Sequence, residues 1–309
     1  MAGAPVGSVG RQRSPMTGAG RPTRGTSGSL RRFARRNQLI VFGVVVLALM
    51  CLVALLAPII ATHDPLKTDT VNRLRPPSTE NWLGTDQYGR DVFSRLVYGS
   101  RVSVQVAFMV MLLTTLAGSA VGLVAGYNRR ADNLLMRIMD GVMAFPAILL
   151  ALAIIAILGS GLFNIVLAIS IAYFPATARI VRGVVIQLRS LDFVLAAGAL
   201  GASHGRIVVR HIVPNVVAPL LVQGAWIAGI AILSEAGLSF IGAGTPPPTP
   251  SWGNMLADGR AFIYHGYWLT VFPGIAIMIA VLGVNLLGDG LRDRLDPRMR
   301  GALGGVDKH

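Results

Sequence analysis

The chain has 309 residues, of which 53% are hydrophobic and 14% charged, and its formal net charge at pH 7 is +14. Soluble globular domains carry about 25% charged residues, so this composition excludes an ordinary soluble domain and indicates a membrane protein. Residues 1–38 hold eight arginines and no acid. Nucleic-acid binding is one interpretation of that charge, but in so apolar a chain the preference of arginine for the cytoplasmic side of a membrane explains it better.

Residues 1–36 consist mainly of Gly, Ser, Pro, Thr and Arg. They cannot bury a core and are predicted to form a disordered cytoplasmic tail whose arginines lie at membrane lipid headgroups. Arg31 and Arg32 could begin a twin-arginine export signal. The apolar run that follows is about 22 residues long, whereas a cleaved signal has an apolar core of about 7–15, so an uncleaved anchor is favoured.

Six predominantly apolar segments are long enough to cross a bilayer, which takes about 20 helical residues. They are residues 39–61, 102–126, 138–158, 162–178, 216–241 and 267–288. Segments 127–137 and 179–211 are rich in arginine and are predicted to be cytoplasmic, whereas 62–100 and 242–266 are predicted to be external. The predicted fold is an all-α integral membrane domain, 37–300, with six spans, both termini in the cytoplasm, and a tail, 301–309.

Three glycines in the second segment, Gly118, Gly122 and Gly126, recur at intervals of four residues. This spacing places them on one face of a helix, where they permit close packing against another helix. The alternative is that they are incidental in a chain with 36 glycines.

Both predicted external segments contain patterned sequence. Val92, Phe93, Leu96 and Val97 recur at helical spacing and predict a short amphipathic helix on the outer surface. Segment 242–266 contains four prolines, which stiffen it, and Trp252, which suits a membrane–water interface.

The stretch 191–214 is too polar to cross the membrane, is rich in Ala, Gly and basic residues, and ends at Pro214. Small residues allow a helix to approach another protein closely, and basic residues favour the cytoplasmic face. We interpret it as a docking element for a cytoplasmic partner, made of a short helix, a glycine turn and a second helix.

No catalytic residues are predicted. The sequence lacks a phosphate-binding G-x-x-x-x-G-K-[ST] loop, and neither Cys51 nor the five scattered histidines form a metal pattern. Two acids near predicted spans, Asp140 and Glu235, are candidates for a transport pathway or an interface, because charge is costly in lipid. For Asp140 a structural ion pair with an arginine such as Arg137 or Arg179 is favoured over substrate contact.

The docking element resembles the cytoplasmic loop of permeases of binding-protein-dependent ABC importers. The pattern of that loop is Glu-Ala-Ala, three residues, Gly, nine residues and then Ile-x-Leu-Pro. Its alanines fall on Ala196 and Ala197, its glycine on Gly201 and its proline on Pro214. Leu195 stands in place of the acid, which removes any salt bridge there.

Four further stretches are similar to the C-type subunit of the dipeptide, oligopeptide and nickel branch of this family. They are residues 83–103, 145–154, 234–256 and 285–298. The resemblance covers about residues 35–300 and implies a type I ABC permease fold in the bacterial inner membrane. It also implies a B-type permease partner, ABC ATPase subunits that bind ATP and Mg²⁺, and an external substrate-binding protein. No cofactor of this chain and no nucleic-acid partner are implied.

The resemblance also assigns roles to particular residues. The ATPase-coupling residues it implies are Ala196, Ala197, Gly201, Ala202, Arg206 and Pro214. The residues expected to face the binding protein are Asp86, Tyr88, Arg90 and Trp252. The substrate it implies is a di- or oligopeptide, with a nickel chelate or another small solute as the alternative; a stand-alone channel, a secondary transporter and a membrane scaffold are the competing classes.

Overall fold

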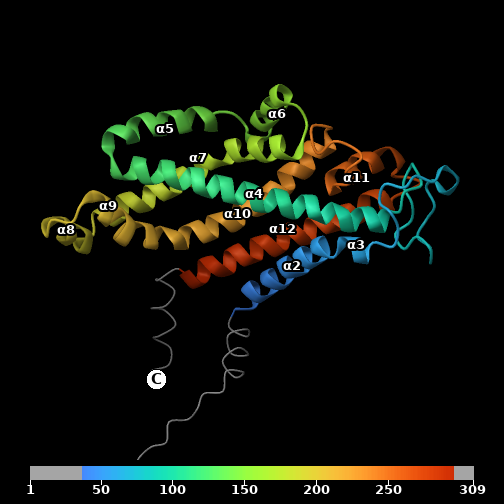
Figure 1. Cartoon of the computed structure of the whole chain (residues 1–309), viewed down its shortest axis with the longest axis horizontal. Helices are drawn as coiled ribbons and strands as arrows, with labels where there is room; N and C mark the ends of the chain where they lie inside the picture. Colours follow the sequence, from blue (N-terminus) through green and yellow to red (C-terminus); the bar gives the residue numbers. More distant parts are fainter. Residues whose placement is uncertain (1–36, 296–309) are drawn as a thin grey trace, which may run out of the picture. The chain divides into compact units, whose positions relative to one another are not determined.

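The computed structural model describes residues 37–295 (Figure 1). In chain order its helices are α2 (Gln38–Leu55), α3 (Ala57–Ile60), η1 (Thr70–Asn72), α4 (Val92–Tyr127), α5 (Arg129–Met143), α6 (Ala147–Leu158), α7 (Leu162–Arg189), α8 (Asp192–Ala199), α9 (His204–Ile207), the π-helical turn η2 (Val208–Ile212), α10 (Val213–Phe240), α11 (Trp252–Gly259), η3 (Arg260–Phe262) and α12 (Trp268–Leu295). The described residues form no named strand. The predicted tails, 1–36 and 301–309, lie outside the described residues.

Within residues 37–295, five helices are long and apolar enough to cross a membrane. They are α2, α4, α7, the continuous helix from α9 through α10 (His204–Phe240), and α12. α5 and α6 meet the same criterion only together, and they are bent by 88° relative to each other. The result is an all-helical membrane domain with five candidate spans, or six if the bent pair counts as one.

The third predicted segment, 138–158, is wrong as a single straight helix. α5 ends at Met143 and α6 begins at Ala147, and Pro146 lies at the break with an extended ψ of 127°. Proline disfavours helical conformation in the residue before it, and it has no N–H to continue the hydrogen-bond ladder. A hydropathy window does not detect such a break because it averages over the residues on both sides of Pro146.

The separate amphipathic helix expected on the outer surface is also wrong. Residues 92–100 are the first turns of α4, which runs unbroken for 36 residues. Both sides of these turns are buried: the apolar side with Val92 and Val97, and the polar side with Ser94 and Arg95. The polar side is covered by the preceding loop, whose Asp91 caps α4 by accepting a hydrogen bond from the Ser94 N–H at 2.8 Å.

The glycine stripe of α4 packs against α7. A Cβ added to Gly118 would lie 2.7 Å from the Thr177 Cβ, and one added to Gly126 would lie 2.6 Å from the Val185 Cβ. A Cβ on Gly122 would lie 2.5 Å from the Ala178 carbonyl oxygen. Real side chains cannot occupy these positions without separating the two helices, so the predicted close packing is confirmed.

The polar segments of residues 37–295 gather at opposite ends of the long helices (Figure 1). α8 and α9 lie at one end, beside the last turns of α7 and the start of α10. Segment 62–91 and α11 lie at the other end, where α11 packs against α10 and α12. The docking element is thereby separated from both segments that were predicted to be external.

Candidate functional site: a docking element and a membrane groove

The docking element folds as two short helices around a glycine turn. α8 ends in a Schellman motif, in which the Gly201 N–H donates to the Gly198 carbonyl at 3.0 Å and the Ala202 N–H donates to the Ala197 carbonyl at 3.1 Å. Gly201 has φ +83°, and a Cβ placed on it would meet no atom within 4 Å. Within this chain Gly201 therefore serves backbone conformation rather than close packing.

α8 exposes apolar side chains at this polar end of the chain. Phe193, Leu195 and Leu200 are exposed, and 90% of Leu200 is accessible. On the other side of the element, Val194 and Ile207 are buried in a cluster that includes residues of α7 and α10. Exposed apolar groups on a firmly anchored polar element indicate a surface for a protein partner.

The other predicted coupling residues differ in their exposure. Ala196 and Arg206 are exposed, whereas Ala197 and Ala202 are half-buried. Pro214 is exposed at the start of α10. The predicted coupling residues thus lie between α8 and the first turn of α10, and the exposed ones are available to a partner.

The helix α9 is joined to α10 without a break. Pro214 has no N–H, and the turn before it is π-helical, with the Val213 N–H donating to the Val208 carbonyl. The Asn215 Nδ2 donates to the His211 carbonyl at 2.7 Å, so that carbonyl is also satisfied. As a result, His204–Phe240 forms one helix of 37 residues that begins in the docking element and continues as a candidate span.

One polar contact joins the docking element to α4, and two others join the end of α7 to the end of α4. The hydroxyl of Tyr127, at the end of α4, lies 2.7 Å from the His204 Nδ1. Arg189, at the end of α7, donates from Nη1 to the Gly126 and Tyr127 carbonyls, at 2.9 Å in each case. Displacement of α8 and α9 would therefore pull on α4, α7 and α10 together.

Asp140 takes part in an ion pair, as the structural interpretation predicted. Its Oδ1 accepts a hydrogen bond from the Arg179 Nη2 at 2.6 Å, and both side chains are exposed. Nearby, Arg182 donates two hydrogen bonds to Asp132, at 2.5 and 2.8 Å. Both pairs join α5 to α7.

Glu235 is fully buried near the last turns of α10. Its Oε1 accepts a hydrogen bond from the Ser239 hydroxyl at 2.7 Å. Ser239 in turn accepts from the Thr245 N–H at 3.3 Å and from the Ser251 hydroxyl at 3.5 Å. Glu235 therefore connects α10 to the loop before α11.

The residues expected to face a binding protein are mostly internal. Asp86 and Arg90 are buried, and the Arg90 Nε donates to the Asp86 Oδ2 at 2.6 Å. Arg90 also lies 3.5 Å from Asp258, and Arg95 approaches the same two acids at 3.5 and 3.7 Å. These pairs hold segment 62–91, α4 and α11 together rather than offering charge to a partner.

Trp252 and Tyr88 differ in their exposure. Trp252 is buried, and its indole N–H donates to the Leu96 carbonyl at 2.9 Å. The Tyr88 side chain is 51% exposed and stacks on the Arg90 guanidinium, whose Cζ lies 4.5 Å from the ring centre. Of the four expected binding-protein contacts, only Tyr88 presents its side chain to the surface in this structure.

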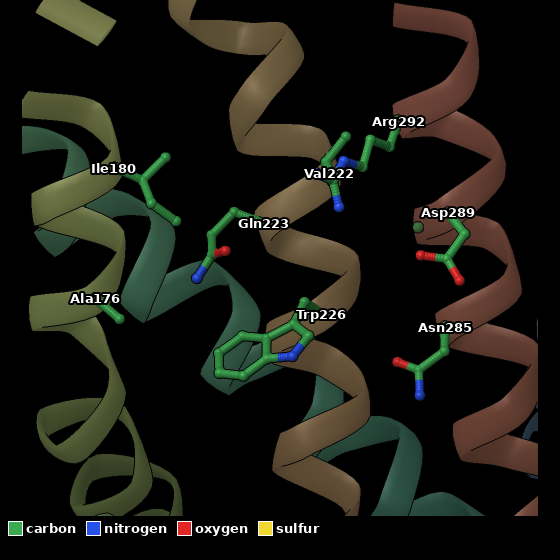
Figure 2. Close-up of a pocket in the computed structure, with 9 residues that line it drawn as sticks. Ala176, Ile180, Val222, Gln223, Trp226, Asn285, Asp289 and Arg292 are labelled. Atoms are coloured by element: carbon green, nitrogen blue, oxygen red, sulfur yellow. The ribbon is translucent and has the colours of Figure 1, made fainter. Parts of the chain in front are cut away.

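A groove of about 510 Å³ lies between α7, α10 and α12 (Figure 2). Asn285, Asp289 and Arg292 project from one face of α12, at positions i, i+4 and i+7. α10 contributes Gln223 and Trp226. Val222 of α10, Gly288 of α12 and the α7 residues Ala176 and Ile180 complete the lining. Neither Asp140 nor Glu235, the two acids picked out from the sequence, lines this groove.

The groove residues were missed because the last predicted span stops at 288. α12 continues to Leu295, so Asp289 and Arg292 belong to the same helix as the apolar run before them. The polar stripe at positions 285, 289 and 292 has the spacing of one helical face, and that periodicity was the available signal.

Comparisons with known proteins agree on one family. Residues 118–301 match the family described as binding-protein-dependent transport system inner membrane component. Residues 27–77 match the N-terminal transmembrane domain of oligopeptide transport permease C.

Curated relatives cover most of the chain. A dipeptide transport system permease protein of Alkalihalophilus pseudofirmus is 46% identical over 267 residues, covering 86% of this chain and 88% of the relative. A probable D,D-dipeptide transport system permease protein of Escherichia coli is 40% identical and covers 93% and 98% of the two chains. A glutathione transport system permease protein of Pectobacterium atrosepticum is 41% identical, with coverage of 87% and 90%.

Proposed function

Because the chain belongs to the family of binding-protein-dependent transport system inner membrane components, we propose that it is a permease subunit of an ATP-driven importer of di- or oligopeptides. The chain is a transport subunit of the inner membrane rather than a catalytic enzyme. The names of its relatives support peptide as the substrate. The match of residues 27–77 supports a C-type subunit that pairs with a B-type permease.

The exposed apolar surface of α8 carries the coupling part of this proposal. α8 follows directly on α7, and α9 runs without a break into α10. An ATPase subunit that binds Phe193, Leu195 and Leu200 would move two candidate spans at once. ATP and Mg²⁺ would be bound by the ATPase subunits. Within the described residues of this chain, no group of three or more His, Cys, Asp or Glu side chains could hold a metal ion.

The proposed topology places the docking element in the cytoplasm. Segment 179–211 carries five arginines and one acid, as expected of a cytoplasmic segment. The opposite end, with segment 62–91 and α11, would then face the external binding protein, with Tyr88 as an accessible contact. We propose that α5 and α6 form one broken span, which would give six spans and both termini in the cytoplasm.

The substitution Leu200→Glu tests the docking surface. Leu200 is almost fully exposed, so the change leaves the packing of this chain intact while placing a charge in the proposed ATPase interface. We expect loss of ATPase copurification and at least a tenfold fall in peptide uptake by the assembled importer, since an unpaired charge buried in an interface costs several kcal/mol.

Val71→Glu is the matched control, because Val71 is also an exposed apolar residue but lies in segment 62–91, at the other end of the chain. It should leave ATPase copurification unchanged. Normal assembly and uptake in Leu200→Glu would contradict the coupling role.

Competition for uptake tests the substrate class. Labelled dipeptide import by the complete importer should be reduced by unlabelled di- to pentapeptides and unaffected by a nickel chelate. Uptake of nickel without peptide competition would assign the importer to the nickel branch. Transport by this chain alone, without an ATPase, would contradict the importer altogether.

A further inference from the structure

The groove between α7, α10 and α12 contains polar side chains that have no partner within residues 37–295. Within residues 37–295, the side chains of Gln223, Asn285, Asp289 and Arg292 make no hydrogen bond or ion pair. All four line the groove, and Figure 2 shows those of α12 projecting from the side nearest α10. Gln223 is buried, whereas Asn285, Asp289 and Arg292 are exposed on the groove side of α12, so their polar groups are available to a ligand.

Near the groove, α12 packs closely against two other helices of the chain. A Cβ on Gly290 would lie 2.5 Å from the Ile40 Cγ1 of α2, which shows how closely the two helices approach. A Cβ on Gly288 would lie 3.1 Å from the Ala225 Cβ of α10, so α12 also approaches α10 closely. The polar stripe of α12 is therefore held in a fixed direction, toward the groove and away from α2.

The charges in the groove match those of a short free peptide. Asp289 can pair with an N-terminal ammonium group, and Arg292 can hold a C-terminal carboxylate with two parallel hydrogen bonds. Side chains three residues apart on a helix have Cβ atoms about 5–6 Å apart. An extended dipeptide spans up to about 7 Å, so a dipeptide can reach both groups at once.

The remaining lining suits the middle of a peptide. Gln223 and Asn285 carry amides that can donate to and accept from a peptide bond. The Trp226 ring is 46% exposed and packs edge-on against Tyr173, with ring centres 6.1 Å apart, so it offers a firm apolar surface to a side chain.

We propose that this groove is a peptide-binding subsite of the translocation pathway, in which Asp289 holds the α-ammonium group and Arg292 the α-carboxylate of a di- or tripeptide. The proposal rests on the function proposed above. It adds a recognition site within the permease, in addition to the recognition provided by the external binding protein.

The test uses the assembled permease–ATPase complex, purified without the binding protein so that only the pathway can bind peptide. Equilibrium dialysis would compare a labelled dipeptide with its N-acetylated and C-amidated forms. Asp289→Asn should weaken binding of the free dipeptide and of the C-amidated form about tenfold, and should leave binding of the N-acetylated form unchanged. Arg292→Gln should weaken the free and N-acetylated forms and leave the amidated form unchanged, and Arg292→Lys should restore part of the affinity.

Asp293→Asn is the matched control, since Asp293 is an exposed acid of the same helix that does not line the groove. It should bind all three peptides as the unmodified complex does. Absence of saturable dipeptide binding by the unmodified complex, or equal losses for free and blocked peptides, would overturn the subsite. The subsite would also be overturned if the Asp289→Asn complex lost its second permease subunit during purification. That result would assign Asp289 to a subunit interface.

The same importer, reconstituted with its binding protein, separates the two levels of the proposal. If the unmodified importer takes up no peptide, the proposed function fails. If it takes up dipeptides and Asp289→Asn does so with unchanged KM and rate, only the subsite fails.

Discussion

Replacing Gly201 with alanine or with asparagine distinguishes two reasons for a glycine at the end of α8. If the glycine is needed for φ +83°, the cost of alanine is the strain of a left-handed residue alone, because its Cβ would meet no atom within 4 Å. That strain is about 1 kcal/mol, which corresponds to a shift of about fivefold in the equilibrium that forms the turn. Asparagine tolerates the left-handed conformation and should cost less, although it is larger.

The assay is the initial rate of peptide uptake by the complete importer, together with copurification of the ATPase. Uptake should fall in the order unmodified, Gly201→Asn, Gly201→Ala. The reverse order for the two variants would refute the conformational argument. It would show that a partner approaches Gly201 so closely that side-chain size decides the outcome.

Two further predictions concern the stability of the detergent-purified permease, measured by thermal unfolding. Gly89→Ala should destabilise it by more than about 3 kcal/mol, because a Cβ at φ +74° would fall on the Asp69 carbonyl oxygen. Gly159→Ala should cost less, about 1–3 kcal/mol, because a Cβ there would meet only the strain of a backbone at φ 84° and ψ 165°, with open space around it. Equal effects of the two substitutions would contradict this reasoning. Asp140→Asn should cost less than about 1 kcal/mol, because its ion pair with Arg179 is exposed. Asp132→Asn should cost more, because its two hydrogen bonds to Arg182 are partly buried. A larger loss of stability in Asp140→Asn than in Asp132→Asn would contradict this ranking of the two ion pairs.

The membrane-spanning helices could be predicted because length and apolarity are local properties of the chain. The close packing of α4 against another helix could also be predicted, because glycines at intervals of four lie on one helix face. The break at Pro146 was not, because flanking apolar residues conceal a bend from any window average. A proline within an apolar run is compatible with either a kinked helix or a broken one, and tertiary packing decides between them.

Burial of charged residues was the harder property to predict. Asp86 and Arg90 have the composition of a surface loop, yet they are buried because each is the partner of the other and of groups on α4 and α11. Such pairing depends on contacts between residues as far apart as 90 and 258. The groove acid Asp289 escapes prediction for a related reason, because hydropathy ends the predicted span at the first charge after the apolar run.

The helix His204–Phe240 has a consequence for the timing of transport. At about 1.5 Å per residue, its 37 residues extend about 55 Å, from the docking element to the hydrogen bond between Glu235 and Ser239. A tilt of about 5° at one end would displace the other by about 5 Å, close to one helical turn. In the proposed importer, a lever of this kind would make opening on one face of the membrane and closing on the other a single mechanical event, with no separate signal passing between them.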